Sequence, residues 1–184
     1  MKAHSHRTAI HRKSLSKPMR ILFSTGPTKR MEPVLDFGCG HGTDVRILRK
    51  HGLDIEGYDP HYQPLMPLRE YTVVTALYVL NVLTLPKRRE ALQEAWGKVK
   101  PGGSLIVAVR THSDVKRHAK KGKWAKLYDG YITGTKTFQH GFSGNELLKL
   151  LGRLPQIASH RGYPLVGLFS RELGPLCAIV RKEK

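Results

Sequence analysis

Short apolar runs alternate with stretches of helical periodicity through the middle of the chain. Four runs are rich in Val, Ile and Leu and bounded by Gly, Pro or Asp, as buried strands are; they lie at residues 33–37, 53–58, 71–77 and 104–109. Between them, apolar side chains recur every three or four residues, which predicts helices at 41–51 and at 86–99, the latter facing the sheet with Ala91, Leu92, Ala95 and Trp96. A tight turn at 101–103 precedes the fourth run. This alternation predicts parallel strands connected by helices.

The last third of the chain departs from this alternation. Residues 111–140 are basic and aromatic without a clear period, so we expect irregular structure there. Ser143 with Glu146 three residues later is a capping box, which opens a helix to about Leu151. Two final strands are predicted at residues 165–169 and 176–180, around a turn at Gly174 and Pro175. The whole pattern predicts an α/β fold with a mainly parallel sheet and an antiparallel C-terminal edge.

Charge changes this picture more than composition does. The 184 residues are 40% hydrophobic and 25% charged, as in one globular domain, but carry a net charge of +18. Residues 1–31 hold eight Lys or Arg and no acid, and residues 110–126 hold seven against Asp114 alone. We expect a basic N-terminal arm over 1–31 and a domain over 32–184 with a basic and aromatic insert at 110–140. Such clustering favours a surface for polyanions, and a solvated basic face is the alternative.

Several classes of protein do not fit the sequence. No apolar run of about eighteen residues is present, and the basic N-terminus lacks the apolar stretch of a signal peptide, although an amphipathic transit peptide stays open. Cys39 and Cys177 form no disulfide framework or metal motif, and we expect them to be packing residues in a cytoplasmic protein. The ten histidines contain no zinc-ligand spacing, so we expect no metal. The sequence does not specify an oligomeric state.

A glycine-rich loop at residues 38–42 (the glycine loop) carries the most specific chemistry. Gly38, Gly40 and Gly42 follow the first strand, where glycine lets the backbone turn and approach a ligand closely. The spacing is not that of the dinucleotide fingerprint, because Thr43 stands at the position of its last glycine. Asp36, two residues before the loop, suits the ammonium group of a methionine better than it suits a pyrophosphate. The loop therefore favours S-adenosylmethionine.

Asp59 ends the second strand, about twenty residues after the loop. A carboxylate in this place can accept hydrogen bonds from both hydroxyls of a ribose. Its alternative is a turn-forming Asp before Pro60. Together with the glycine loop, the binding interpretation is favoured.

These residues resemble motif I and the acidic residue after it in class I methyltransferases. Residues 71–83 resemble the fourth strand of that superfamily and the loop behind it, and residues 89–109 resemble its next helix and strand, so the resemblance covers about 32–109. It implies a Rossmann-like fold and S-adenosylmethionine as cofactor. Cofactor contacts are then expected from Asp36, Gly38, Gly40, Gly42, Asp59, Pro60 and Leu77. Substrate contacts and catalysis are expected from Tyr78 and Asn81, for which loop capping and packing are the alternative.

A narrower resemblance links the arm and the insert to DNA. Residues 8–18 (TAIHRKSLSKP) and 129–139 are similar to methyltransferases associated with DNA phosphorothioation systems, which implies a DNA-linked context. In the arm, phosphate contacts are expected from His11, Arg12 and Lys13, with a disordered solvated arm as the alternative. In the insert, stacking on unpaired bases is expected from Lys123, Trp124 and Tyr131, with the small core of a lid as the alternative.

Two features depart from the superfamily. The stretch between Asp59 and Tyr71 is too short for the usual helix, strand and acid that recognise adenine, so the fold is compact here. The adenine then lies against Pro60, His61, Tyr62 or Leu65, or the pocket is degraded. The loop after the fourth strand is not Asp-Pro-Pro-Tyr, and no Pro-Cys pair follows it, which leaves cytosine C5 methylation without a nucleophile.

Three hypotheses follow for the function. The first is a methyltransferase of nucleic acid, with DNA preferred to RNA because of the narrower resemblance. The second is a methyltransferase of a nucleotide or another anionic small molecule, favoured by the loop at residues 78–83. The third is a methyltransferase-like protein that binds nucleic acid without chemistry, favoured by the shortened adenine segment.

Overall fold

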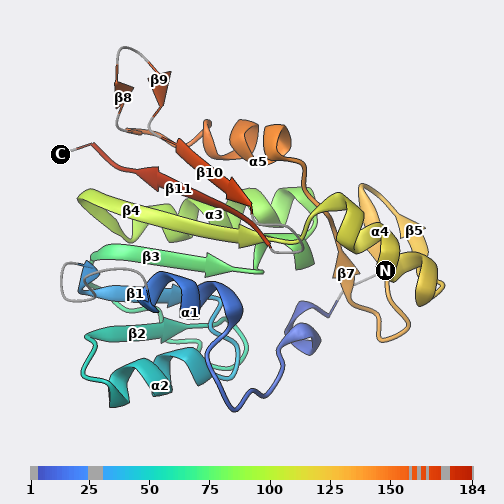
Figure 1. The fold of residues 1–184 in the computed structure, drawn as a ribbon, viewed down its shortest axis with the longest axis horizontal. Coiled ribbons are helices and arrows are strands. Elements are labelled where there is room, and N and C mark those ends of the chain that lie inside the picture. Colours follow the sequence, from blue (N-terminus) through green and yellow to red (C-terminus); the bar gives the residue numbers. More distant parts are fainter. Residues whose placement is uncertain are drawn as a thin grey trace.

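A six-stranded sheet forms the centre of the computed structural model, which describes residues 4–24, 31–157, 159–160, 163–164, 166–170 and 175–183 (Figure 1). Its strands follow the order β10-β11-β4-β3-β1-β2. Their bounds are β1 Val34–Phe37, β2 Ile55–Tyr58, β3 Tyr71–Leu77, β4 Val99–Val109, β10 Val166–Ser170 and β11 Leu176–Arg181. The first four run parallel, β11 is antiparallel to β4, and β10 is antiparallel to β11. The predicted mainly parallel sheet with an antiparallel C-terminal edge is therefore confirmed.

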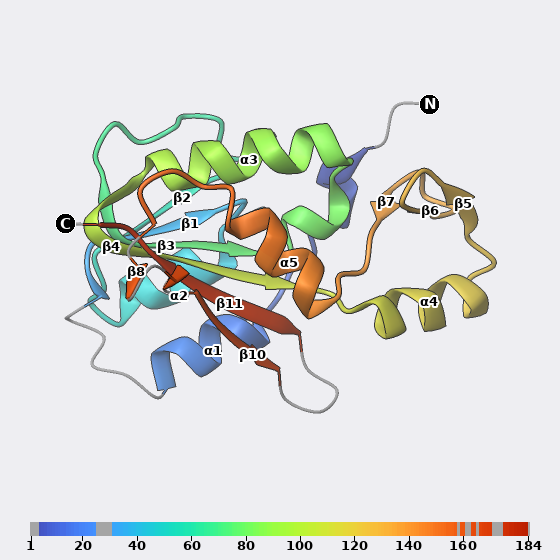
Figure 2. The ribbon, with the colours of Figure 1, turned by 90° about the horizontal axis from the view of Figure 1, so that it is seen from above.

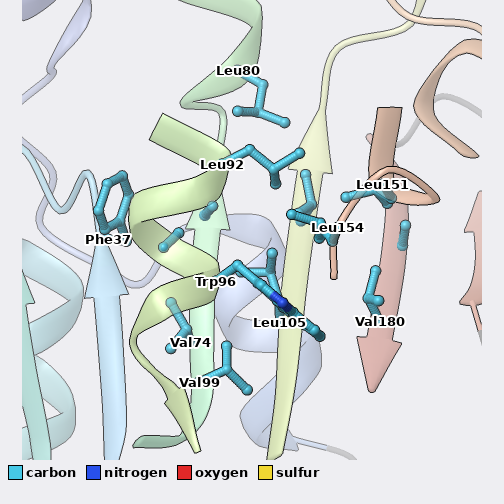
Figure 3. Close-up of a cluster of buried hydrophobic side chains, with 14 of the residues drawn as sticks. Phe37, Val74, Leu80, Leu92, Trp96, Val99, Leu105, Leu151, Leu154 and Val180 are labelled. Carbon is cyan, nitrogen blue, oxygen red and sulfur yellow. The ribbon is translucent and has the colours of Figure 1, made fainter. Parts of the chain in front are cut away.

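Helices cover both faces of the sheet. One face packs against α3 (Leu85–Gly97) and α5 (Gly144–Leu151), and the other against α1 (Lys17–Ser24) and α2 (Thr43–Lys50) (Figure 2). Alternate residues of β4 serve the two layers, because Leu105 packs towards α3 while Ile106 packs towards α1 and α2. Trp96 and Leu92 of α3 lie over Leu105, as the helical spacing predicts (Figure 3).

The connection from β2 to β3 is the shortened part of the fold. Residues 59–70 contain an isolated bridge between Asp59 and Gln63 but no helix or strand. Therefore β2 is the edge strand on this side, and the chain returns directly to β3 in the middle of the sheet. At the carboxyl end of β2, residues 59–70 therefore form one loop.

The insert at 110–140, which we call the lid, is more regular than expected. It contains α4 (His112–Lys121) and a small antiparallel sheet of β5 (Ala125–Leu127), β6 (Gly130–Ile132) and β7 (Phe138–Gln139). The expectation of irregular structure was wrong because α4 buries only Val115 and Ala119, too few apolar residues to produce a visible period. In Figure 1 the lid lies beyond the carboxyl ends of β3 and β4.

Element boundaries also differ from the prediction. The fourth strand begins at Val99 rather than 104, because a register shift between Tyr71 and Val73 absorbs the predicted turn into β4. The helix predicted at 41–51, which is α2, begins at Thr43, because Gly42 before it has a left-handed backbone. The turn predicted at Gly174 and Pro175 is only partly described, because Gly174 lies outside the described residues.

The arm contributes two short helices, η1 (Ser5–Thr8) and α1, and η3 (Leu80–Val82) precedes α3. The remaining strand pair, β8 (Ser159–His160) with β9 (Tyr163–Pro164), lies far from the lid (Figure 1). In the part of the chain that the structure describes, no helix has the length and apolar character needed to span a membrane.

Candidate active site

A cleft of about 750 Å³ opens at the carboxyl ends of the parallel strands. Its walls come from the glycine loop, the loops after β2 and β3, the start of α3 and the arm. This is the end of the sheet at which open α/β folds bind their ligands. Of the predicted cofactor residues, the cleft is lined by Asp36, Gly38, Gly40, Asp59, Pro60 and Leu77.

Backbone geometry explains the glycines of the loop. Gly38 donates its N–H to the carbonyl of Tyr58 at 2.7 Å and has a φ of +78°. A Cβ at this position would lie 2.3 Å from Cγ2 of Val79, so a side chain here is excluded both by strain and by space. Gly42 also has a positive φ, but it faces Gln63 and does not line the cleft. Its place in the loop serves the turn into α2.

Asp59 forms the contacts of a turn-forming residue and also lines the cleft. One carboxylate oxygen, Oδ1, accepts the backbone N–H of His61 at 2.9 Å and that of Tyr62 at 3.0 Å, which closes the turn after β2. The other, Oδ2, accepts the N–H of Gly40 at 3.2 Å and so holds the glycine loop against β2. Asp59 still lines the cleft, where the second lone pair of Oδ2 can accept a hydroxyl group.

Asp36 is a buried carboxyl at the floor of the cleft, only 4% exposed. Its Oδ1 accepts a hydrogen bond from the hydroxyl of Thr75 at 2.9 Å. Burial, together with the nearby charge of Asp44, raises the pKa of Asp36 to about 7. A cationic group placed beside Asp36 would favour its ionised form.

The arm lies across the glycine loop because Asp44, at the start of α2, binds it. Arg12 forms an ion pair with Asp44 at 2.7 Å, and the backbone N–H of Ser16 donates to the same carboxylate at 2.8 Å. Arg12, for which we expected a phosphate contact, lines the cleft and holds the arm to Asp44, and its Nε has no hydrogen-bond partner among the described residues. Lys13 is exposed and lies outside the cleft lining.

Stacked rings close the arm over the loop after β2. His11, expected to contact phosphate, stacks on His41 of the glycine loop with centroids 3.7 Å apart. His6 stacks on His61 at 4.1 Å, and the carbonyl of His6 accepts a hydrogen bond from the hydroxyl of Tyr62. The sequence analysis missed this role of the histidines, because the partners are distant in sequence.

Tyr78 and Asn81 both line the cleft after β3. Tyr78 has a φ of +62°, a strained backbone for a bulky residue, and donates its N–H to the carbonyl of Ala108. Burial raises the pKa of its phenol to about 12, so it stays protonated. Asn81 is 2% exposed, and its side-chain oxygen has no hydrogen-bond partner among the described residues. A buried amide oxygen without a partner is a ready acceptor for a ligand N–H or O–H.

A buried polar cluster attaches the lid to the rim of the cleft. Arg88 of α3, 1% exposed, pairs with Asp129 of the lid at 2.6 Å and donates to the carbonyls of residues 80 and 83. His140 bonds the carbonyl of Asp129 and the carboxylate of Glu146, each at 2.7 Å, and donates its backbone N–H to the carbonyl of Asn81. Lid docking and the position of Asn81 are therefore linked.

The sequence held two signals of this cluster. Arg88 lies four residues before Leu92 and seven before Ala95, so it falls on the apolar stripe of α3, where a cation needs a buried partner. Ser143 caps α5 as predicted, accepting the N–H of Glu146. The Glu146 side chain, however, binds His140.

The predicted aromatic residues of the insert lie away from the cleft lining. Lys126 sits over the ring of Tyr131 at 4.8 Å, Lys123 is exposed, and Trp124 lines a separate hollow beside the cleft. Lys123, Trp124 and Tyr131 thus do not line the cavity that contains Tyr78 and Asn81.

Both cysteines are free, and Cys39 lies in the cleft lining. Burial raises the pKa of both Cys39 and Cys177, which keeps them as neutral thiols. Within the described ranges, no three His, Cys, Asp or Glu side chains gather as a metal site would require.

Comparison with known proteins bears on this site. Residues 6–153 match the family model described as a methyltransferase domain. No curated protein matches the chain. An O-methyltransferase family protein from Burkholderia thailandensis has a similar structure, with a TM-score of 0.59 at 18% identity, covering 91% of this chain and 56% of its own. This chain thus spans little more than half the length of that relative.

Two further solved structures contain S-adenosylhomocysteine. They are the 1,6-didemethyltoxoflavin-N1-methyltransferase of Burkholderia thailandensis (TM-score 0.55, 15% identity, 90% of this chain and 82% of that one) and the magnesium protoporphyrin IX methyltransferase of Synechocystis PCC 6803 (0.56, 16%, 90% and 80%). At these identities the similarity establishes a common fold. Because the family model covers most of the sequence, the chain belongs to the methyltransferase domain family.

Proposed function

We propose that the protein is an S-adenosylmethionine-dependent methyltransferase that acts on nucleic acid. The observation that carries the cofactor assignment is the cleft itself, in which Asp36, Asp59 and the bare backbone of the glycine loop line one wall. Family membership and the cofactor product in similar structures support it. The thiols of Cys39 and Cys177 fit a reducing compartment, and we place the protein in the cytoplasm.

The residues present fit this cofactor. Asp59 would accept a ribose hydroxyl and Asp36 would hold the methionine ammonium, while Gly38 and Gly40 would present bare backbone to the ligand. Pro60 and His61 line the cleft and are available to the adenine, whereas Leu65 is exposed and lies outside the lining. When bound, the cofactor supplies an electrophilic methyl group, so the protein has chiefly to align the acceptor atom.

The acidity of Asp36 predicts how binding depends on pH. Because the pKa of Asp36 is about 7, its charged form declines below neutrality, and with it the attraction for an ammonium group. The affinity for S-adenosylhomocysteine should therefore rise about tenfold or more between about pH 5.5 and 7.5, then level off. The raised pKa of Asp36 has the opposite effect on the stability of the free protein. The free energy of unfolding decreases as the pH rises from the ordinary pKa of an aspartate, which applies in the unfolded chain, towards 7. Calorimetric titration with S-adenosylhomocysteine across this pH range measures the change in affinity.

Asp36→Asn is the control for this pH dependence. It keeps an acceptor for Thr75 while removing the titrating group. Its affinity should be lower at neutral pH and nearly independent of pH. A flat profile for the unmodified protein would contradict the assignment of Asp36 to the ammonium group.

The acceptor end of the cleft lies at Tyr78 and Asn81. The buried side-chain oxygen of Asn81 can accept a hydrogen bond from an N–H or O–H of the substrate. Exocyclic amino groups of bases offer such donors. Tyr78, protonated at neutral pH, can donate from its hydroxyl. Both residues would orient the acceptor, which needs no covalent enzyme intermediate.

Charge supports nucleic acid as the substrate. The lid helix α4 exposes Lys116, Lys120 and Lys121, none of which has a carboxylate partner within the described part of the chain. The one acid of α4, Asp114, is already paired with Arg110 and Arg117. Lysines of this kind supply affinity for phosphate. The similarity of residues 8–18 and 129–139 to phosphorothioation-associated methyltransferases favours DNA over RNA, with the target base flipped out or single-stranded.

Transfer of a labelled methyl group from S-adenosylmethionine tests the proposal. We expect incorporation into single-stranded DNA, with less into duplex DNA and RNA. Asn81→Ala should lower kcat by about tenfold or more, since one hydrogen bond to the substrate is lost, without changing the affinity for S-adenosylhomocysteine. No incorporation into any nucleic acid by a protein that binds S-adenosylhomocysteine, or binding of DNA that ignores salt, would refute the nucleic-acid substrate.

A small anionic molecule is the second candidate substrate. Two of the similar structures are methyltransferases of 1,6-didemethyltoxoflavin and of magnesium protoporphyrin IX. In this chain, the arm already covers part of the cleft, which limits the room for a large substrate. Turnover of free nucleotides without turnover of oligonucleotides would decide for this candidate.

A further inference from the structure

A second hollow, of about 510 Å³, lies between the arm and the lid. We call it the lid hollow. The arm contributes Arg7 and Thr8 to its lining, and the lid, including Arg110, contributes the rest. Thr8, Arg110 and Gln139 line both the lid hollow and the cleft, so the two cavities adjoin. Whatever occupies the lid hollow would therefore lie next to the acceptor end of the cleft.

The two cavities differ in charge. The cleft lining contains more acids than Lys or Arg: Asp36, Asp44, Asp59, Glu90, Glu94 and Asp114 against Arg12, Lys17, Lys87 and Arg110. The lining of the lid hollow contains Arg7, Arg110 and His118 and no acid among the described residues. A cationic ligand thus suits the cleft and an anionic ligand suits the lid hollow.

Hydroxyl groups and an aromatic ring complete the lining. Thr133, Thr135 and Thr137 meet through their hydroxyls, at 3.0 Å and 2.7 Å from that of Thr133. The backbone N–H of His4 donates to the carbonyl of Lys136, which ties the arm to the same loop. Trp124 lies against Gly122, where a Cβ would come within 2.4 Å of its Nε1, and its ring centroid lies 6.4 Å from that of His118.

We propose that the lid hollow binds a phosphorylated nucleoside, the nucleotide unit next to the one that receives the methyl group. Arg7 and the threonine hydroxyls would hold the phosphate, and Trp124 would stack on the base. Arg7 is exposed and has no ion-pair partner in the described part of the chain, whereas Arg110 is already paired with Asp114. This assignment rests on the proposed function, because it takes the cleft as the site of methyl transfer.

The two tryptophans of the chain make the lid hollow directly observable. Trp96 is 3% exposed in the core, and Trp124 lines the hollow, so a ligand in the hollow should change the fluorescence of Trp124. The full-length protein, with S-adenosylhomocysteine present, is titrated with a short single-stranded DNA, a nucleoside monophosphate and inorganic phosphate. We expect both the DNA and the nucleotide to quench the fluorescence of Trp124. If the natural ligand is a nucleic-acid strand, the DNA should quench it more strongly than the nucleotide does. Inorganic phosphate should not quench.

Matched variants separate a site from general electrostatic attraction. Arg7→Gln and Arg20→Gln each remove one charge from the arm, but Arg20 lies on α1, outside both cavity linings. Arg7→Gln should weaken binding of labelled DNA, measured by anisotropy, about tenfold, and Arg20→Gln less than about twofold. In Trp124→Phe the intrinsic quenching should vanish while labelled DNA still binds.

The contrary outcomes are equally specific. Equal weakening by Arg7→Gln and Arg20→Gln, or equal quenching by inorganic phosphate, would overturn the assignment of the lid hollow. Failure of every ligand to quench, in a protein that binds S-adenosylhomocysteine, would also overturn it and leave the cofactor proposal intact. Absence of S-adenosylhomocysteine binding, measured calorimetrically on the same sample, would instead refute the proposed function.

Discussion

Replacing Asp59 by alanine is expected to lower the affinity for S-adenosylhomocysteine by about a hundredfold or more. A hydrogen bond to a charged group contributes about 1.5–3 kcal/mol, and the proposal assigns a ribose hydroxyl to the free lone pair of this carboxylate. The same change removes the acceptor that Gly40, His61 and Tyr62 share, so the glycine loop loses one of its contacts with the end of β2 and the turn after β2 loses two hydrogen bonds. Both losses act in the same direction. Calorimetry measures the affinity, and thermal unfolding measures the cost to the fold.

Asp59→Asn separates the two losses. Its amide oxygen can still accept the N–H groups of His61 and Tyr62, which keeps the turn, but its amide NH₂ faces the N–H of Gly40 and cannot accept from it. We expect thermal stability near that of the unmodified protein and an affinity between those of the parent and Asp59→Ala. Unchanged affinity in Asp59→Ala would mean that the carboxylate serves the turn alone.

Replacing Asp129 by alanine is expected to destabilise the protein by about 3 kcal/mol, because it leaves the buried guanidinium of Arg88 without its counter-charge. Asp129 is 38% exposed, which lets water compensate in part and keeps the estimate at the lower end of about 3–5 kcal/mol for broken buried pairs. For a chain of this size the melting temperature should fall by about 6–12 °C. The lid should also lose its attachment, so methyl transfer should fall more than cofactor affinity.

Two comparisons make this prediction specific. Asp54→Ala breaks an ion pair with Arg69 in which both side chains are exposed, and it should cost less than about 1 kcal/mol. Combining Asp129→Ala with Arg88→Met removes the buried charge and should recover much of the lost stability. If Asp129→Ala were no more harmful than Asp54→Ala, the cluster would not be what docks the lid.

Local patterns in the sequence were enough to predict the framework of the fold. The four parallel strands, the glycine loop and the apolar face of α3 each arise from neighbouring residues whose spacing reflects their environment. The N-cap of α5 at Ser143 was found for the same reason. Asp36 and Asp59 could be predicted as cleft residues because their positions relative to the glycine loop place them at the carboxyl ends of two adjacent strands.

Features that depend on distant partners could not be predicted in this way. Arg12 has the sequence context of a phosphate-binding residue, and only the folded chain brings Asp44 to it. The secondary structure of the lid was missed because its helix buries two small apolar side chains and its strands have two or three residues. Asn81 was predicted from its place after β3, but its unpartnered oxygen becomes evident only when its neighbours are known.

Calorimetric titration of the full-length protein with S-adenosylhomocysteine tests the central claim most directly. We expect one molecule to bind per chain with a Kd in the micromolar range, and the heat to disappear in Asp59→Ala. Repeating the titration with single-stranded DNA present covers the case in which the substrate completes the cleft beside Asn81. Absence of binding under both conditions, in a protein that unfolds cooperatively, would contradict the account of the cleft as a cofactor site.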